Sequence, residues 1–307
     1  MKGFSFVYMT LSRKHWRVAP EAPADYLSQF PHSDRLLVQV LYNRGIRDLD
    51  GVTAFLDGGL EEVNPFAMAG VPDAVTRIKQ ALRREERMAV YGDFDVDGLS
   101  ATALMVQTLR ALGGHVEPYI PHRVDEGYGL SKKALSALAG DGVSLVVTVD
   151  CGVRAIEEIR YANQLGLDVV VTDHHSVGRR LPEAVAVIDP KRSESPGYAP
   201  GECFDELCGS GVAYRLAQAL LRSHDKAPAT PQDVSLQEDD LLDLVALGTV
   251  ADLVPLLGEN RALVRRGLER LNGMERPGVR ALCETAGLRP GAVDATAIGY
   301  ILGPRLN

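Results

Sequence analysis

Three aspartates stand at alternate positions directly after a short apolar run. The run is residues 88–91, Met-Ala-Val-Tyr, and the carboxylates belong to Asp93, Asp95 and Asp97. On an extended segment, side chains at every second position point the same way, so these carboxylates would lie close together. Like charges repel strongly there unless a cation lies between them, and hard divalent cations prefer oxygen ligands. The stretch predicts a cation site, although an aspartate-rich loop that caps the next helix would give the same sequence.

Two further apolar runs end in side chains that can bind metals. Residues 144–150 finish at Asp150, and residues 168–173 are followed by His174 and His175. Continuous apolar runs indicate strands buried on both faces of a parallel sheet, and sites in such sheets gather at the carboxyl ends of the strands. One aspartate after a strand is commonly a helix cap, and a histidine pair is commonly a polar turn. Three such ends at one edge of a sheet favour a metal site.

A fourth candidate is Asp252, which falls inside an apolar run at residues 244–256 that is expected to form a buried helix. A buried carboxylate needs a partner; a metal ion would supply one, and backbone N–H groups at a helix end are the alternative. Four carboxylates and an imidazole fit two cations that share a carboxylate. These candidate ligands are Asp95, Asp97, Asp150, His174 and Asp252, with Asp93 and His175 nearby. Two cations about 3.5–4 Å apart suit phosphoryl transfer to water, and mixed oxygen and nitrogen ligands favour Mn²⁺ or Mg²⁺.

The composition is that of a soluble globular protein. Its 307 residues are 46% hydrophobic, and the formal net charge is −8. That charge argues against a polyanion binder driven by overall charge, so contacts with nucleic acid must come from local basic patches. No apolar run is long enough to cross a bilayer, the first residues lack the apolar core of a signal peptide, and the four cysteines are scattered. We expect reduced thiols, a cytoplasmic location and no membrane partner.

From residue 88 onward, apolar strands alternate with helices, which predicts an α/β fold with a parallel five-stranded sheet flanked by helices. The expected strands are 88–93, 115–120, 144–150, 168–173 and 184–188. The expected helices include 34–44, 50–56, 72–87, 99–112, 131–139, 153–165 and 260–272. We predict three parts, namely a small helical lead-in at 1–87, a catalytic domain at 88–258, and C-terminal helices with the start of an interdomain linker at 259–307.

Four motifs in this chain resemble the signature motifs of the DHH phosphoesterase superfamily. They read GDFDVDG, VDCG, TDHH and GTVAD in chain order. Further segments resemble the RecJ-like single-strand-specific exonucleases within that superfamily: GYGL, IDPK, GSGVA, ENR and the terminal LGPRLN. RecJ-like proteins continue beyond this last motif into a DHH-associated domain, so the resemblance implies that this chain is truncated before that domain.

The resemblance implies two Mn²⁺ ions, with Mg²⁺ as the alternative, that activate a water for attack on a phosphodiester. One ion would be held by Asp95 and Asp150. The other would be held by Asp97, Asp150, His174 and Asp252, so that Asp150 bridges the pair. His175 would lie near the scissile phosphate as a charge-stabilising donor, or else support His174, and Asp93 is expected to join it as a catalytic residue. Relatives that hydrolyse pyrophosphate carry a histidine where this chain has Tyr91, which weakens a pyrophosphatase interpretation.

Substrate contacts are expected from five further residues. These are Arg305, Asn307, His122, Arg123 and Ser210. Arginine and amide side chains are suited to phosphate oxygens, and a basic residue with the neighbouring Tyr128 could clamp a phosphate and stack a base. A polar surface loop is the alternative for residues 122–128.

The implied function is 5′→3′ exonuclease activity on single-stranded DNA, releasing 5′-mononucleotides in DNA repair and recombination. Two alternatives stay open: hydrolysis of short oligonucleotides, cyclic dinucleotides or pyrophosphate, and a non-catalytic RecJ-like scaffold. The expected partners are single-stranded DNA, a single-strand-binding protein and a helicase, and the chain is expected to be a monomer.

Overall fold

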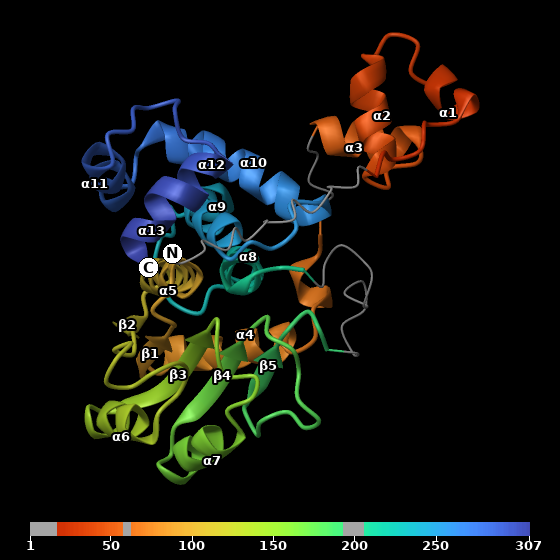
Figure 1. Ribbon diagram of the computed structural model, residues 1–307. Coiled ribbons are helices and arrows are strands. Elements are labelled where there is room, and N and C mark those ends of the chain that lie inside the picture. The colour runs from red at the N-terminus through yellow and green to blue at the C-terminus, as the bar shows by residue number, and fades with distance from the viewer. Residues whose placement is uncertain (1–16, 58–62, 193–205) are drawn as a thin grey trace, which may run out of the picture. The chain divides into compact units, whose positions relative to one another are not determined.

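The computed structural model describes residues 17–57, 63–192 and 206–307. The chain divides into two compact units between Asp57 and Gly58, and each is described by itself. The prediction that the first residues are not a signal peptide, and the prediction for Cys203, concern residues outside the described ranges. The other three cysteines, Cys151, Cys208 and Cys283, are buried free thiols. Figure 1 shows the elements in chain order.

The first unit is a small helical cluster. Its helices are α1 (Ala24–Ser28), α2 (Arg35–Asn43) and α3 (Leu49–Asp57). Asp34 begins α2 because its side chain accepts hydrogen bonds from the N–H groups of Leu36 and Leu37, at 2.7 and 3.2 Å. A compact apolar core joins the helices through Tyr26, Phe30, Val38, Leu41 and Val52.

The second unit is built on a parallel five-stranded sheet, which confirms the predicted fold class. The strand order is β2-β1-β3-β4-β5, and every neighbouring pair is parallel. The strands are β1 (Arg87–Tyr91), β2 (His115–Tyr119), β3 (Val143–Val149), β4 (Asp168–Thr172) and β5 (Ala186–Ile188). Because all five run the same way, the segments that follow β1, β3 and β4 leave the sheet at one edge, which is where the candidate ligands lie.

Helices cover both faces of this sheet (Figure 1). One face carries α4 (Val71–Arg83), α5 (Val96–Ala111) and α8 (Gly209–Lys226), and the other carries α6 (Lys132–Gly140) and α7 (Ile156–Gln164). Alternate strand residues pack into the hydrophobic cores on the two faces of the sheet. Met88 and Val90 belong to the core under α4, α5 and α8, whereas Ala89 and Tyr91 belong to the core under α6 and α7. Burial on both faces explains why the strands are continuously apolar.

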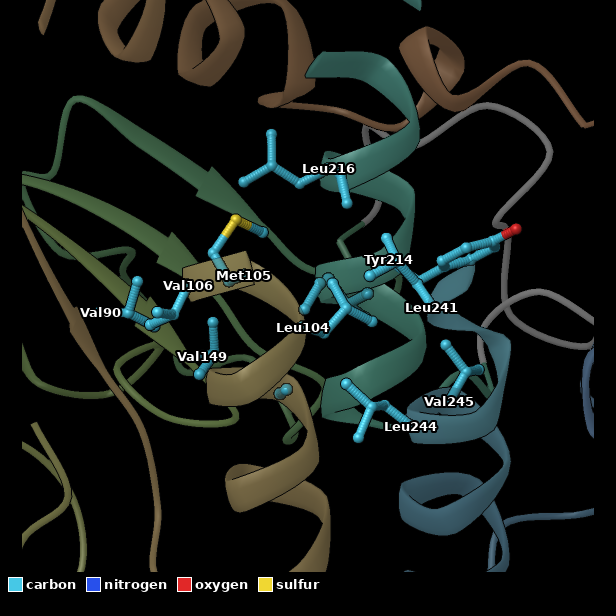
Figure 2. Close-up of a cluster of buried hydrophobic side chains, with 14 of the residues drawn as sticks. Val90, Leu104, Met105, Val106, Val149, Tyr214, Leu216, Leu241, Leu244 and Val245 are labelled. Atoms are coloured by element: carbon cyan, nitrogen blue, oxygen red, sulfur yellow. The ribbon is translucent and has the colours of Figure 1, made fainter. Parts of the chain in front are cut away.

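A further layer of helices packs on α5 and α8. It contains α9 (Leu242–Ala251), α10 (Gly258–Gly273) and α11 (Pro277–Thr285), with shorter helical segments at Glu238–Leu241, Ala295–Ala297, Ile298–Leu302 and Gly303–Leu306. The short segment Pro65–Ala67 precedes α4 and packs against α4 and α8. Figure 2 shows Leu104 of α5 between the sheet and the side chains of Tyr214 on α8 and Leu244 on α9. This apolar contact packs α5, α8 and α9 against one another.

The predicted helix at 244–256 is too long. The helix α9 ends at Ala251, and Asp252 is its C-terminal cap. Leu253 then adopts a left-handed backbone with φ of 62°, and Pro255 cannot continue a helix. The predicted three-part division of the chain stays a prediction; α4, which we placed in the lead-in, packs against β5 and α8. In the part of the chain that the structure describes, no helix has the length and apolar character needed to cross a membrane.

Candidate metal centre

The aspartate-rich stretch follows β1 and opens α5. Asp95 is the N-cap of α5, and its Oδ1 accepts a hydrogen bond from the Gly98 N–H at 2.9 Å; Asp97 lies in the first turn. The prediction that residues 93–97 form one extended segment is therefore wrong, because capping by Asp95 turns the chain into a helix at Val96. Helix capping and cation binding are therefore compatible in this stretch, because the carboxylates still lie close together.

Asp97 is held from the opposite side by the N-terminus of α8. Its side chain is 1% exposed and accepts hydrogen bonds from the N–H groups of Gly209 at 2.6 Å and Ser210 at 2.9 Å. These N–H groups have no partner within their own helix, and the helix dipole favours a negative charge at that end. The carboxylate is thereby fixed at the edge of the sheet. A side chain at Gly248 would overlap both Asp97 and the Ser210 hydroxyl.

Asp150 lies at the centre of the cluster, directly after β3. Its backbone is left-handed, with φ of 61°, and its N–H donates to the Thr172 carbonyl at 3.0 Å. Burial raises the pKa of the Asp150 carboxyl well above its ordinary value, and the charges of Asp97 and Asp95 raise it further. A carboxyl in this position is stabilised as an anion only if positive charge is brought to it.

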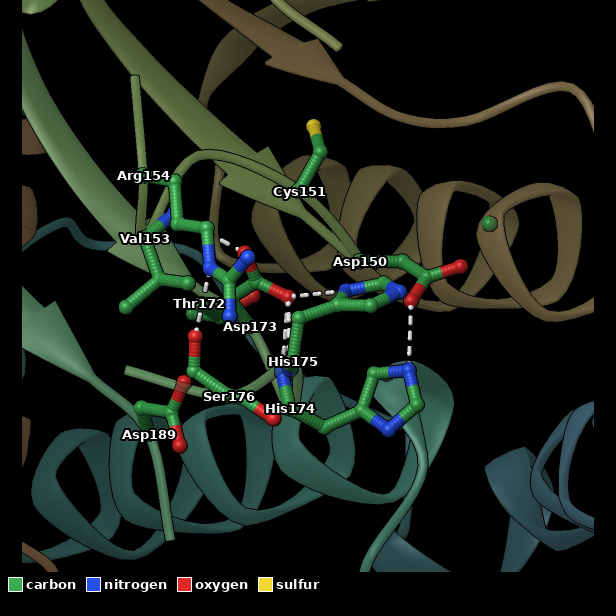
Figure 3. Close-up of polar contacts among 12 residues, drawn as sticks. Asp150, Cys151, Val153, Arg154, Thr172, Asp173, His174, His175, Ser176 and Asp189 are labelled. Atoms are coloured by element: carbon green, nitrogen blue, oxygen red, sulfur yellow. Dashed lines mark hydrogen bonds and ion pairs between the residues drawn. The ribbon is translucent and has the colours of Figure 1, made fainter. Parts of the chain in front are cut away.

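His174 places both of its ring nitrogens near carboxylates, and Figure 3 shows the nitrogen that faces Asp150. Nε2 lies 3.0 Å from Asp150 Oδ1 and 4.0 Å from Asp97 Oδ2, and Nδ1 lies 3.8 Å from Asp252 Oδ2. Burial lowers the pKa of His174, although the Asp97 charge opposes that shift. A neutral imidazole has a lone pair on one nitrogen, which a carboxylate would repel, so a cation between the two groups would satisfy both.

The candidate ligands form two neighbouring groups. Ligand atoms of Asp93, Asp95 and Asp150 lie within 4.8 Å of one another, and so do those of Asp97, His174 and Asp252. Asp150 also lies within 4.8 Å of His174 and His175. The five ligands predicted from sequence therefore meet at one place, Asp150 lies between the two groups, and Asp93 joins the first of them.

The residues fit a pair of hard divalent cations. Five of the six ligands in the two groups are carboxylates and one is an imidazole, a set typical of Mn²⁺ or Mg²⁺. Asp150 Oδ1 is buried; His174 Nε2 lies 3.0 Å from it, but the pair does not have the geometry of a hydrogen bond. Buried polar atoms are normally satisfied, so a buried carboxylate oxygen without a hydrogen bond, lying among other candidate ligands, fits a bound cation.

The pH dependence of Mn²⁺ binding tests these ligands. Burial raises the pKa of Asp93 to about 6 and that of Asp252 to about 7. For both carboxyls, the pKa in the folded state lies above the unfolded value of 3.8. Their contribution to folding stability is therefore present at low pH and is lost as the pH rises through about 6 to 7. Mn²⁺ binds the deprotonated groups. Added Mn²⁺ should therefore raise the thermal unfolding midpoint more near pH 8 than near pH 5.5. Equal shifts in a melting series at the two pH values, against chelator-treated protein, would contradict the assignment.

His175 differs from His174 in exposure and in partners. Its side chain is 44% exposed, and Nδ1 lies 2.7 Å from Asp173 Oδ1, a hydrogen bond that raises the pKa of His175. Asp173 is 1% exposed; burial raises its pKa, but the hydrogen bonds from His175 and the Val153 N–H outweigh burial and lower it overall. We did not predict a role for Asp173 from sequence, although its place at the end of an apolar strand is the same signal that identified Asp150.

Tyr91 does not take part in the ligand groups. It is fully buried, stacks on Tyr119 with ring centroids 4.8 Å apart, and donates its hydroxyl to the Gly129 carbonyl at 3.0 Å. Asp93 instead brings a third carboxylate to Asp95 and Asp150.

The predicted substrate contacts fall into different surroundings. Ser210 is fully buried, with its N–H bonded to Asp97 and its hydroxyl 3.2 Å from Cys208 Sγ, and its contact with substrate stays a prediction. Asn307 Oδ1 accepts a hydrogen bond from the Val96 N–H at 3.1 Å, between the ligands Asp95 and Asp97.

The other three predicted contacts are cationic or titratable side chains. Arg305 is exposed and donates to the Ile301 carbonyl at 2.6 Å. Arg123 lies over the ring of Phe94, 4.2 Å from its centroid, and so stands beside the aspartate-rich stretch. His122 is exposed and pairs with Asp125 at 2.9 Å.

A model of the DHH family, N-terminal domain, matches residues 87–249, which is more than half of the chain. The chain belongs to the DHH family. The matched residues include the ligands Asp93, Asp95, Asp97, Asp150 and His174, and end three residues before Asp252.

Several curated proteins similar to this DHH-family chain are described as single-stranded-DNA-specific exonuclease RecJ. The Bacillus subtilis protein is 38% identical over 97% of this chain, and the Dickeya dadantii protein is 40% identical over 91%. The aligned region is 36% of the first protein and 48% of the second, so the chain spans less than half the length of these relatives.

Solved structures of RecJ share the fold. RecJ from Thermus thermophilus in complex with Mn²⁺ has a TM-score of 0.75 and 30% identity, covering 94% of this chain and 39% of that one. A second RecJ, bound to manganese, has a TM-score of 0.65 and 35% identity over 78% of this chain and 56% of that one. The Thermus protein has also been solved with Mg²⁺. These relatives bind the same class of hard divalent cation that fits the ligand set described above.

Proposed function

We propose that this DHH-family chain hydrolyses phosphodiester bonds of single-stranded DNA with two divalent cations, degrading the strand from its 5′ end to 5′-mononucleotides. The observation that carries the proposal is the pair of ligand groups on either side of Asp150. A pair of cations sharing one carboxylate is suited to in-line displacement at phosphorus. The relatives described as single-stranded-DNA-specific exonucleases support the substrate class.

The residues divide into two binding groups and one donor. Asp93, Asp95 and Asp150 would hold one cation, and Asp97, His174 and Asp252, with Asp150 shared, would hold the other. Bound there, the cations supply an activated water and neutralise charge at the scissile phosphate.

His175 is the donor next to these groups. Asp173 fixes its Nδ1, which leaves Nε2 of this half-exposed side chain to donate a hydrogen bond to an oxygen of the phosphodiester as charge develops. Arg123 lies over the ring of Phe94, beside the aspartate-rich stretch, and would attract the DNA backbone.

The wider role belongs to the same proposal. We propose that the chain acts in DNA repair and recombination in the cytoplasm, uses Mn²⁺ with Mg²⁺ as a substitute, and works with a single-strand-binding protein and a helicase that expose its substrate. The net charge of −8 fits an enzyme that depends on cations and local basic side chains rather than on overall charge.

Digestion of end-labelled single strands tests the reaction. With Mn²⁺, a 5′-labelled strand should release labelled mononucleotide at once, whereas a 3′-labelled strand of the same sequence should shorten progressively. A duplex of that sequence is the control and should be degraded at least about ten-fold more slowly, because its ends are paired. Activity confined to the shortest oligonucleotides would replace this proposal with that of a short-oligonucleotide hydrolase, and Mn²⁺ uptake without hydrolysis would favour a scaffold.

A further inference from the structure

Tyr128 lies in the loop between β2 and α6, beside the metal centre. Its neighbours Gly127 and Gly129 have φ of 78° and 83°, a left-handed backbone that a side chain would strain. The Gly129 carbonyl accepts the hydroxyl of the buried Tyr91 at 3.0 Å, which attaches the loop to the sheet. The loop therefore holds Tyr128 in a defined place, although Tyr128 is 54% exposed.

The hydroxyl of Tyr128 touches two parts of the centre at once. It lies 3.2 Å from the backbone carbonyl oxygen of Asp150 and 3.2 Å from Nδ1 of His175. The Tyr128 and His175 rings meet edge to face, with centroids 5.6 Å apart and planes at 66°. The Tyr128 hydroxyl thus connects Asp150, which lies between the two ligand groups, with the half-exposed His175.

Counting protons gives the direction of these hydrogen bonds. Asp173 Oδ1 already accepts the N–H groups of His174 and His175, at 2.7 and 3.2 Å, so it is the acceptor for His175 Nδ1 at 2.7 Å. The single proton of Nδ1 then points at Asp173, and the Tyr128 hydroxyl cannot donate to that nitrogen. Tyr128 donates to the Asp150 carbonyl instead, and its oxygen shares the Nδ1 proton.

The bond to Asp150 bears on a strained residue. A left-handed backbone, with φ of 61°, is unfavourable at a non-glycine residue and persists only where its surroundings hold it. The Asp150 N–H is held by Thr172, and the Tyr128 hydroxyl holds its carbonyl. Gly209, whose missing side chain leaves room for the Asp150 carboxyl, closes the third side.

We propose that Tyr128 is a positioning residue, whose hydroxyl holds the Asp150 peptide in its left-handed conformation and the His175 ring in one orientation. This inference rests on the proposed function only in that the ligand groups must bind cations. Through Asp150, the Tyr128 hydroxyl acts on both ligand groups. Through the His175 ring, it sets the orientation of the hydrogen-bond donor at the phosphate.

Two matched variants test the role. Tyr128→Phe removes the hydroxyl and keeps the ring, whereas Tyr119→Phe removes a neighbouring hydroxyl that bonds Glu126 at 2.6 Å. Calorimetry should give Mn²⁺ affinity about ten-fold weaker in Tyr128→Phe, and within about two-fold of the parent in Tyr119→Phe. With single-stranded DNA, Tyr128→Phe should lower kcat about ten-fold with KM unchanged, because ground-state binding of the strand is kept.

The outcomes separate the two proposals. Equal Mn²⁺ affinities and equal kcat values in the two variants would overturn the positioning role. A parent that binds Mn²⁺ but degrades no single-stranded DNA would overturn the proposed function, while the calorimetric comparison would still decide the role of Tyr128.

Discussion

Asp150→Asn is expected to abolish Mn²⁺-dependent hydrolysis, by about a thousand-fold or more, while the metal-free protein keeps its thermal midpoint. Asp150 stands between the two ligand groups, so both cations lose an anionic ligand, and about 4 kcal/mol of transition-state stabilisation corresponds to that loss of rate. The fold should survive because asparagine tolerates a left-handed backbone, and because a neutral amide replaces a carboxyl whose pKa burial already holds well above its ordinary value.

Asp189→Asn is the matched control for this variant. Asp189 is another fully buried aspartate after a strand, and burial raises its pKa to about 7, but among the described residues it belongs to neither of the two ligand groups. Its Oδ1 accepts the Lys191 N–H at 2.8 Å, a bond that asparagine can keep. Steady-state rates with Mn²⁺ should therefore fall in Asp150→Asn alone. Parallel losses in both variants, or near-parental rates in Asp150→Asn, would remove the bridging role.

Gly209→Ala is expected to lower activity by about a hundred-fold and stability by about 1–3 kcal/mol. Gly209 opens α8, and a Cβ at this position would overlap Cβ, Cγ and Oδ1 of Asp150. The contact is with a buried, backbone-restrained residue rather than with the end of a flexible chain. Either the start of α8 or the Asp150 carboxyl must move, and the Gly209 N–H bond to Asp97 at 2.6 Å moves with the helix.

Gly278→Ala controls for the change of residue type. Gly278 also lies in the first turn of a helix, α11, and a Cβ there meets nothing within 4 Å. This variant should keep full activity and should be as stable as the parent or more so, since alanine is the better helix former. Denaturant unfolding and initial rates should be measured on both variants. Parental rates in Gly209→Ala would show that the centre tolerates displacement, contrary to the tight packing described here.

The sheet and the convergence of five candidate ligands could be predicted because the signals are local. The continuous apolar run of β3 dictates a strand buried on both faces, and the parallel topology then brings the residues after β1, β3 and β4 to one edge. Asp252 was identified for a different reason, since a carboxylate within an apolar run needs a partner. In the structure, Asp252 lies in one ligand group with His174 and Asp97.

The features that were missed depend on contacts between distant segments. The capping of Val96 by Asn307 joins residues 211 positions apart, and no local pattern in either segment indicates it. The support of Asp97 by the first N–H groups of α8 joins residues 112 and 113 positions apart, so no local sequence pattern indicates that the Ser210 N–H bonds this carboxylate. Asp173 was passed over because its hydrogen bonds to Val153 and His175 become apparent only when β3 and β4 lie side by side.

The wide spacing of the ligands along the chain governs when a cation can act during folding. The first of them, Asp93, and the last, Asp252, are brought together only after all the parallel crossovers and the docking of α8 and α9 are complete. Such non-local assembly is slow, and a nascent or half-collapsed chain has no pocket to offer an ion. Bound cations would therefore leave the folding rate unchanged and would slow unfolding. The two cations would thus increase the kinetic stability of the folded protein.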